Sequence, residues 1–357
     1  MTPPTWMDDE LAAFRDQVRK VFEREFAPQE SRWREQHCVD RAVWRRAGEL
    51  GLLCTSIPAA YGGAGGTFAH EAVVAQEQAR ALVNSFSINV HSGIVAHYLL
   101  AYGSEAQKDR WLPPMARGEI VAAIAMTEPG AGTDLQAIRT RARRGCDDSG
   151  DHYVIDGAKT FVTNGHHADL ICVAVKTDAA TRGANGISLL MVETAGLAGF
   201  RRGALLPKIG QHGQDTNELF FDAVRVPAAN LLGGDEGQGF RQLMQQLARE
   251  RLLIAVAALG TMWRALDETL AYVRQREVFG APLLALQHTR FTLAECRTEA
   301  ALCEAYVDQC IVRQLAGTLD VSSAAMAKWS ATDKLGRIVD ACLQLHGASS
   351  NTSPARP

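Results

Sequence analysis

The segment LARERLLIA, residues 247–255, places one carboxylate, Glu250, where a mixed polar run becomes an apolar helix pattern. A carboxylate buried beside apolar groups has a raised pKa and can act as a general base near neutral pH. Leu253 and Ile254 stand three and four residues later, so no intrahelical ion pair in that direction neutralises Glu250. The alternative is structural, because a glutamate in the first turn of a helix is stabilised by the helix dipole without any function.

The helix that carries Glu250 is expected to pack along one side in a helical bundle. Large apolar side chains recur there at alternating steps of four and three: Leu252, Val256, Leu259, Trp263, Leu266, Leu270 and Val273. Glu250 is in line with Ile254, Ala257 and Thr261, on a second face of smaller side chains. A helix that is apolar on two faces is expected to be buried, and the small side chains would leave room for a ligand beside the carboxylate.

A second candidate segment is AMTEPGAGTD, residues 125–134, in which an apolar run opens into a loop. The loop offers threonine hydroxyls and glycine N–H groups, the donors that a phosphate or a flavin ring edge requires. The pattern is weak by itself, since Pro-Gly is a general turn signal. Leu135 stands where the third glycine of GxGxxG would be, and GxxxxGK[ST] does not occur, so neither standard phosphate loop is expected.

Other kinds of catalytic site receive little support from the sequence. The eight cysteines and ten histidines show no zinc-ligand spacing, so we expect no metal site, and the adjacent His166 and His167 cannot share one face of regular structure. Cys296, Cys303 and Cys310 recur every seven residues, which favours a seam of small buried side chains over metal or redox chemistry. No GxSxG segment occurs, which argues against a hydrolase.

The composition of the 357 residues is that of an ordinary globular protein, with 47% hydrophobic and 22% charged residues. The net charge of -3 gives no basic surplus that would indicate nucleic acid or an anionic membrane as a partner. No apolar run approaches the ~20 residues that span a bilayer. The start, MTPPTWMDDELAAF, lacks the features of a signal or transit peptide, so a cytoplasmic location is expected.

The sequence periodicity changes twice and predicts an α+β multidomain protein. Helical spacing predicts an α-helical N-terminal domain over residues 1–119. Short β-rich runs bounded by Gly, Asp or Pro predict a middle β-barrel or sandwich domain over 120–232. The helical period returns over 233–347, which predicts a C-terminal helical bundle, and the polar residues 348–357 predict a disordered tail.

Two local predictions follow from turn and breaker residues. Residues 8–27 form an amphipathic pattern that predicts one helix ending at Pro28. In HYVIDGAKTFVTNG, two β-rich runs flank Asp156 and Gly157, which predicts a hairpin with its turn at these two residues.

At this point the segments AMTEPGAGTDL, KTFVTNG, ERLLIA, VRQREVFGAPLLALQ and CLQLHG, in this order, resemble the acyl-CoA dehydrogenases. The resemblance runs from about residue 8 to residue 347, and NVHSGIV at 89–95 is most similar to the long-chain branch. It implies a helical N-terminal domain, a middle β domain and a C-terminal bundle. It also implies FAD held between domains and across a subunit interface of a homotetramer or other homo-oligomer.

The implied reaction is α,β-dehydrogenation of a fatty acyl-CoA to the trans-2-enoyl-CoA, with electrons passing to an electron-transfer flavoprotein. A base removes the α proton while the flavin accepts hydride at N5, a role that no side chain can fill. In the members that this chain resembles, the base is the glutamate of ER, which corresponds to Glu250. Arg251 resembles an arginine that lies near the substrate.

The resemblance also implies which residues hold FAD. Phe161 stands where many relatives have tryptophan, which keeps an aromatic face but lacks the indole N–H donor. Thr133 resembles a residue near both the pyrophosphate and the substrate. The full implied set is Met126, Thr127, Gly132, Thr133, Phe161 and Thr163, together with Arg276, Phe279, Gln287, Gln344 and Gly347, which would reach the FAD of a neighbouring subunit.

After CLQLHG the sequence departs from the family pattern, because Ala348 replaces a second glycine and a polar tail follows. We therefore expect a truncated C-terminus that lacks the last part of the bundle. The alternative function is a catalytically impaired or non-catalytic member that binds acyl-CoA or a partner protein. An acyl-CoA oxidase is the neighbouring enzymatic alternative, and a thioesterase is disfavoured because no activated nucleophile is visible.

Overall fold

The computed structural model describes residues 4–148, 150–178, 181 and 183–348, so most of the tail predicted over 348–357 lies outside the described residues. The chain forms two compact units. The first unit comprises residues 1–27, 68–83 and 248–357, and the second comprises residues 28–67 and 84–247. None of the described helices combines the length and the apolar composition needed to span a lipid bilayer.

The second unit begins with helical elements, as predicted for this part of the chain. Its α-helices are α2 (Glu30–Gln36), α3 (Arg41–Glu49), α5 (Ala96–Tyr102) and α6 (Glu105–Ala116), and a π-helical turn, Asn89–Val95, precedes α5. A capping box fixes the start of α6, because Ser104 accepts a hydrogen bond from the Gln107 backbone and the Gln107 side chain accepts one from the Ser104 N–H.

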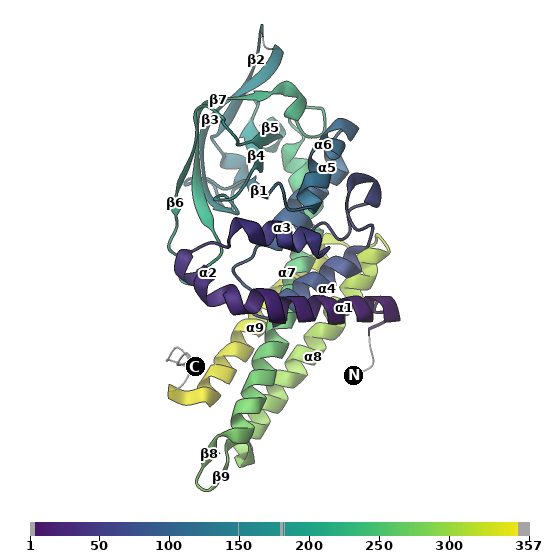
Figure 1. Cartoon of the computed structure of the whole chain (residues 1–357), viewed down its shortest axis with the longest axis vertical. Helices are drawn as coiled ribbons and strands as arrows, with labels where there is room; N and C mark the ends of the chain where they lie inside the picture. Colours follow the sequence, from purple (N-terminus) through teal and green to yellow (C-terminus); the bar gives the residue numbers. More distant parts are fainter. Residues whose placement is uncertain (1–3, 149, 179–180, 182, 349–357) are drawn as a thin grey trace. The chain divides into compact units, whose positions relative to one another are not determined.

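The β part of the second unit is one curled sheet of seven strands (Figure 1). The strand order is β1-β4-β2-β3-β7-β6, and β5 pairs with β4. β1 runs parallel to β4, whereas β3 is antiparallel to β2 and β7. The strands are β1 (Ala122–Ala125), β2 (Arg141–Asp147), β3 (Gly150–Thr163), β4 (Leu170–Lys176), β5 (Ile187–Glu193), β6 (Phe200–Leu205) and β7 (Thr216–Pro227).

Both faces of β4 and β5 are buried, and each face belongs to a different core. Alternate residues of β4, Leu170 and Cys172, pack with α5, α6 and the π-helical turn, which lie beside the sheet in Figure 1. Ile171 and Val173 point to the other side and pack inside the curl against β3 and β7. Because the sheet is curled, the side chains on its inner face fill the interior of the curl, while those on its outer face pack against the helices.

The predicted hairpin at Asp156 and Gly157 is wrong, because β3 runs straight through these residues from Gly150 to Thr163. The register against β7 shifts between Ile155 and Gly157, so the dipeptide forms a bulge within the strand. Gly157 has a φ of +151°, and a Cβ there would lie 2.5 Å from Thr140 Oγ1. The glycine is therefore required by close backbone packing rather than by a turn.

The first unit contains α1 (Asp9–Val21), α4 (Phe68–Arg80), α8 (Gln287–Leu315), α9 (Val321–His346) and the part of α7 (Gly239–Gln275) from Ala248 onward. Figure 1 shows α7, α8 and α9 side by side, with the hairpin of β8 (Glu277–Val278) and β9 (Ala281–Pro282) joining α7 to α8. The predicted stop at Pro28 is wrong. After α1 the chain continues as a π-helical turn and a 3₁₀ turn that includes Pro28, and α2 follows directly.

The packing seam predicted for α7 is confirmed, since its members are buried except for the half-buried Leu270. The cysteine seam of α8 is confirmed as well, because Cys296, Cys303 and Cys310 are buried free cysteines. The prediction that the second face of α7 is buried is wrong: Ile254 is 46% exposed, and Ala257 and Thr261 are only half-buried. α7 is therefore buried on the side of the seam and partly open on the side of Ile254.

Candidate functional site

The loop after β1 forms a tight turn within the second unit. Glu128 and Ala131 exchange two backbone hydrogen bonds of 2.9 and 3.0 Å around Pro129 and Gly130. Beyond the turn, Gly132 faces open space, since no atom lies within 4 Å of a Cβ built on it, and Thr133 is exposed. The backbone N–H groups and the Thr133 hydroxyl are therefore accessible to a ligand, as predicted from the sequence.

A buried ion pair holds this loop to β3. Lys159 Nζ donates hydrogen bonds to the Met126 carbonyl at 3.0 Å and to Glu128 Oε1 at 2.8 Å. The Glu128 carboxylate also accepts the backbone N–H groups of Arg139 and Thr140 at 2.6 and 3.0 Å. Burial lowers the pKa of Lys159 to about 8, although Glu128 opposes this shift. Burial alone would raise the pKa of Glu128, but Lys159 and the hydrogen bonds lower it overall, so the carboxylate stays ionised.

The end of β3 lies directly beside the loop. Thr160 N–H donates to the Thr127 carbonyl at 2.9 Å, and the Thr127 hydroxyl donates in return to the Thr160 carbonyl. The next residue, Phe161, has a φ of +57° and is 69% exposed. A left-handed backbone at an exposed phenylalanine is unfavourable, and such strain is typical of ligand sites. The structure thus brings Met126 and Thr127 together with Phe161 and the half-buried Thr163.

The predicted base, Glu250, lies in the first unit on α7. This helix begins at Gly239, so Glu250 is about three turns inside it. The helix-dipole explanation does not apply, because that effect falls off within the first turn. Glu250 is half-buried, as is Arg251. The preceding residue, Arg249, forms an ion pair with the buried Glu71 of α4 and lies over the Phe68 ring.

The remaining predicted residues lie toward the other end of α7. Phe279 and Gly280 are the two central residues of the β8–β9 hairpin, with φ values of +51° and +80°, and Phe279 is 98% exposed. Arg276 directly precedes β8, and Gln287 is the first residue of α8. The end of α9 is also nearby, since His346 stacks on Tyr272 with ring centroids 4.3 Å apart. The exposed Gln344 and Gly347 flank this histidine.

Three family models cover most of the chain. The acyl-CoA dehydrogenase N-terminal domain matches residues 8–119, the middle domain matches residues 123–224 and the C-terminal domain matches residues 237–355. The chain belongs to the acyl-CoA dehydrogenase family. The resemblance found in the sequence is therefore confirmed, and so is the order of a helical, a β and a helical part.

Individual members of the family are similar over most of their length. The mitochondrial long-chain specific acyl-CoA dehydrogenase of Mus musculus is 42% identical over 335 residues, covering 94% of this chain and 76% of the relative. The mitochondrial isovaleryl-CoA dehydrogenase of Pongo abelii is 36% identical, covering 84% of this chain and 71% of the relative. A crystal structure of acyl-CoA dehydrogenase from Geobacillus kaustophilus has a TM-score of 0.95 at 41% identity, covering 99% of this chain and 92% of that chain.

Membership makes the chain an FAD-dependent oxidoreductase of acyl-CoA thioesters. A family structure, a glutaryl-CoA dehydrogenase from Mycobacterium smegmatis in complex with FADH2, has a TM-score of 0.89 at 28% identity and covers 97% of this chain and 86% of that chain. The residues of this acyl-CoA dehydrogenase fit the flavin. An exposed aromatic ring on a strained backbone offers a face for the isoalloxazine, and an open glycine loop offers N–H donors.

A buried histidine supports the same region without facing a ligand. His91, in the NVHSGIV segment, accepts a hydrogen bond at Nδ1 from the Ala122 N–H at 3.0 Å, and its Nε2 donates to the Met115 carbonyl at 3.1 Å. Burial lowers the pKa of His91 to about 4, so the ring is neutral at physiological pH. His91 therefore fixes the first residue of β1, four residues before the loop at Met126.

Proposed function

We propose that this acyl-CoA dehydrogenase oxidises a fatty acyl-CoA to the trans-2-enoyl-CoA, with Glu250 as the base that removes the α proton. The observation that carries the proposal is the placement of Glu250 well inside α7, next to an arginine that Glu71 already neutralises. The exposed side chain of Ile254, one turn further on, adds apolar surface that a bound acyl chain would cover. The 42% identity to a long-chain specific relative supports a fatty acyl chain as the substrate.

In this mechanism the chain's own residues position the thioester and move one proton. The Glu250 carboxylate takes the α proton, and Arg251, the next residue on α7, binds the substrate through its positive charge. Bound FAD supplies the hydride acceptor for the β hydrogen. Hydrogen bonds to the thioester carbonyl stabilise the enolate-like charge that develops as the proton leaves.

We assign the cofactor contacts to two groups of residues. Phe161 and Thr163 would hold the isoalloxazine ring, while the loop after β1 would bind the ring edge and the pyrophosphate through Met126, Thr127, Gly132 and Thr133. The second group reaches the FAD of a neighbouring subunit, and the extreme exposure of Phe279 at a hairpin tip supports this role. That group is Arg276, Phe279, Gln287, Gln344 and Gly347.

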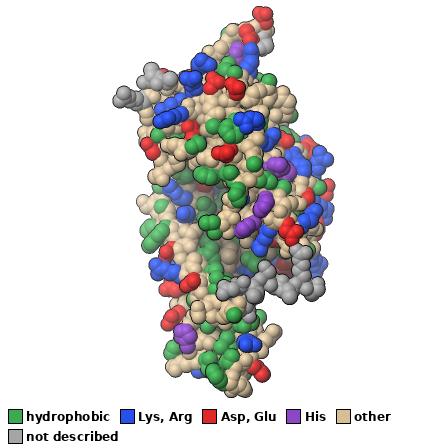
Figure 2. Space-filling view, turned by 90° about the vertical axis from the view of Figure 1, so that its left-hand side faces the viewer, with side chains coloured by type: hydrophobic (Ala, Val, Ile, Leu, Met, Phe, Trp, Pro, Cys, Tyr) green, Lys and Arg blue, Asp and Glu red, His purple; other side chains and the backbone are tan. Residues whose placement is uncertain are grey.

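A homo-oligomer, a tetramer or a dimer, is part of the same proposal. Large apolar side chains are exposed on α8 and α9. Figure 2 shows hydrophobic side chains gathered on the surface of the lower part of the molecule. Examples are Phe291 and Leu302 on α8 and Met326 and Trp329 on α9, of which Trp329 is 68% exposed. Exposed apolar surface of this kind favours association with a second copy.

The electron acceptor, the domain boundaries and the location of the protein are also part of the proposal. An electron-transfer flavoprotein is the expected acceptor, and one structural neighbour is described as an electron transferring flavoprotein of Acidaminococcus fermentans. The division into three domains, with boundaries after residues 119, 232 and 347, is likewise proposed, while packing divides the chain into two compact units. A cytoplasmic location stays a prediction, while the mouse and rat relatives are described as mitochondrial.

The test is the anaerobic visible spectrum of the FAD-loaded protein before and after addition of a long-chain acyl-CoA. We expect the flavin bands to bleach, and the Glu250→Gln variant to bind FAD and acyl-CoA but to lose most of the reduction, because an amide cannot accept the proton. Undiminished reduction in Glu250→Gln would overturn the assignment of the base. A protein that takes up no FAD would favour the non-catalytic alternative, and fast reoxidation by O2 would favour an oxidase.

A further inference from the structure

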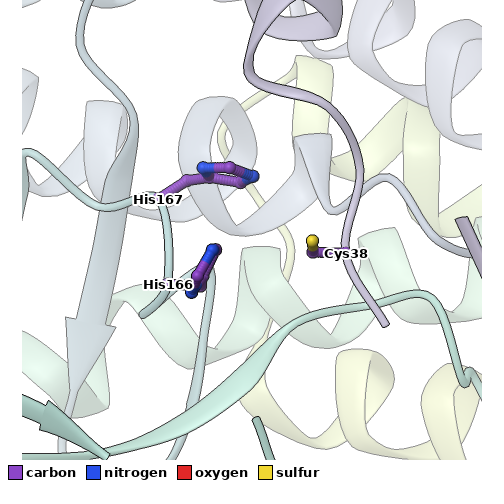
Figure 3. A group of neighbouring side chains, drawn as sticks. All are labelled: Cys38, His166 and His167. Atoms are coloured by element: carbon purple, nitrogen blue, oxygen red, sulfur yellow. The ribbon is translucent and has the colours of Figure 1, made fainter. Parts of the chain in front are cut away.

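The second unit contains a cluster of three side chains that the flavin site does not use. Cys38 lies in the connection between α2 and α3, and His166 and His167 lie in the turn between β3 and β4. One ligand atom of each residue lies within 4.8 Å of the others, and Figure 3 shows the two imidazole rings close together with the Cys38 sulfur across from them on a separate segment. No metal site was predicted at these residues, because the cysteines and histidines show no zinc-ligand spacing in the sequence.

The adjacent histidines converge because they lie in a turn and not in a strand or a helix. In regular structure neighbouring side chains diverge, whereas the turn residues His166 and His167 place their rings 4.9 Å apart with a T-shaped geometry. The turn itself is held in place. The backbone N–H of His166 donates to the buried Asp215 carboxylate at 2.8 Å, and Arg41 donates to the His167 carbonyl at 2.8 Å.

The protonation state of His167 follows from its hydrogen bond. Its Nε2 lies 2.7 Å from the Val39 carbonyl, and a carbonyl can only accept, so Nε2 carries the proton. The lone pair is then on Nδ1. Metal-binding histidines commonly donate their second ring N–H to a backbone carbonyl, which fixes the ring and its tautomer. Val39 is the residue next to Cys38, so this bond also ties the two segments of the cluster together.

We propose that Cys38, His166 and His167 form a site for a single zinc ion, with a water molecule in the fourth position. A thiolate and two imidazoles are ligand types that Zn2+ prefers, and three protein ligands plus water complete a tetrahedron. Bond lengths of about 2.3 Å to sulfur and about 2.0 Å to nitrogen place the ligand atoms roughly 3.3–3.6 Å apart. The cluster therefore needs to contract by about an ångström, and the exposed His166 can make this movement.

Charged groups of both signs lie near the cluster. Burial raises the pKa of the Cys38 thiol, and the nearby carboxylates of Asp215 and Asp40 raise it further. His166 is exposed, so an ion can reach its ring from solvent. Arg202 is the positive group that acts on His166, and its guanidinium already donates to backbone carbonyls, that of Gly165 at 2.9 Å and that of Ala168 at 2.6 Å.

A bound ion would join two segments of the second unit that are remote in sequence. Binding releases the Cys38 thiol proton to water, and the thiolate replaces it with a bond to the metal. The β3–β4 turn, which begins directly after Thr163, would then be fastened to the connection between α2 and α3. A ligand that binds only the folded chain raises its stability, so Zn2+ should raise the unfolding temperature.

The primary experiment is isothermal titration of the FAD-loaded protein with Zn2+, after treatment with a chelator and under a metal-free reductant. We expect one ion per chain, and an affinity at least about 100-fold weaker in Cys38→Ser and in His166→Gln, because losing a ligand costs more than losing an outer partner. The matched controls are Cys146→Ser, which removes an exposed cysteine elsewhere, and His288→Gln, which removes an exposed histidine of α8. Both controls should bind as the parent does.

Co2+ in place of Zn2+ reports the ligands directly. Tetrahedral Co2+ with a thiolate ligand absorbs at the red end of the visible spectrum, where oxidised flavin does not, so the holoprotein can be used. We expect these bands in the parent and in Cys146→Ser, and their loss in Cys38→Ser. In both variants the flavin spectrum, and the unfolding temperature measured without metal, should be the same as in the parent. Equal Zn2+ affinity in the parent and Cys38→Ser, or the absence of the red bands in the parent, would overturn the site.

Discussion

The ammonium of Lys159 lies 2.8 Å from Glu128 Oε1, and the Lys159 side chain is fully buried. The pair joins β3 to the loop that follows β1, and it also satisfies two backbone N–H groups and the carbonyl of Met126. The loop that we assign to the flavin is therefore held in position by a buried ion pair. Its precision depends on both partners, since a lone buried charge is strongly unfavourable.

Lys159→Met should consequently destabilise the protein by about 3–5 kcal/mol, because it leaves the Glu128 carboxylate buried without its partner. The double variant Lys159→Met/Glu128→Gln should recover part of this loss, as the amide oxygen can still accept a backbone N–H. Denaturant unfolding of the three proteins measures both effects. Equal stability of the single and the double variant would show that the ion pair is not what holds the loop.

Phe161 offers a test in which fold stability and cofactor binding move in opposite directions. Its φ of +57° is strained for phenylalanine but not for glycine, and its ring is largely exposed. Phe161→Gly should therefore leave the FAD-free protein as stable or stabilise it by about 1 kcal/mol. The same variant should bind FAD more weakly, since it lacks the aromatic face.

The measurements are unfolding of the FAD-free protein and titration with FAD. Phe161→Tyr is the matched control, because it keeps the aromatic face and should bind FAD as the parent does. A loss of stability in FAD-free Phe161→Gly, with unchanged FAD affinity, would mean that the ring packs against protein and does not serve the flavin.

His91 predicts an acid-dependent loss of stability. Its pKa in the folded state is about 4, below the ordinary value of 6.5, so the unfolded chain takes up the proton first as the pH falls. The stability from the neutral ring is complete above pH 6.5 and is lost as the pH falls through about 4. The shift corresponds to about 3 kcal/mol at full loss.

The check is the free energy of unfolding at pH 7 and near pH 4 for the parent and for His91→Gln. The variant starts lower but should lose less on acidification, because glutamine does not titrate in this range. His288→Gln, at an exposed position, should follow the parent. If His91→Gln and the parent lose equal stability on acidification, other groups carry the acid sensitivity.

The sequence predicted the elements whose pattern is set by burial. The apolar seam of α7 and the cysteine seam of α8 repeat at helical spacing because each repeat must face the same core, so both could be read without coordinates. At Asp156 and Gly157 the sequence pattern led to a wrong prediction of a hairpin turn. A dipeptide that tolerates unusual backbone angles suits a bulge as well as a turn, and the close approach at Gly157 comes from Thr140, the residue that precedes β2.

Part of the candidate site was equally hidden from the sequence. The loop at Met126–Thr133 could be proposed from its glycines and threonines, but the link from Thr127 to Thr160 depends on strand placement. Cys38 could not be connected to His166 and His167, because the chain between them forms α3 to α6 and β1 to β3. Ligand spacing in the sequence identifies metal ligands that lie on one element, whereas this cluster combines residues from two separate connections.

In the loop after β1, a substitution at Gly132 can test FAD binding without affecting the stability of the fold. A Cβ added there meets no atom within 4 Å, and its φ is not in the positive region, so Gly132→Ala should change the stability of the FAD-free protein by less than about 0.5 kcal/mol. If the pyrophosphate approaches this backbone as we propose, the methyl group should nevertheless weaken FAD binding by about tenfold or more, a change of ~1.4 kcal/mol.

The matched control is Gly196→Ala, at another glycine without close neighbours but with a φ of +64°. This variant should show the reverse: lower stability and unchanged FAD affinity. FAD titration and denaturant unfolding of both variants decide the matter, and unchanged FAD affinity in Gly132→Ala would remove this glycine from the cofactor site.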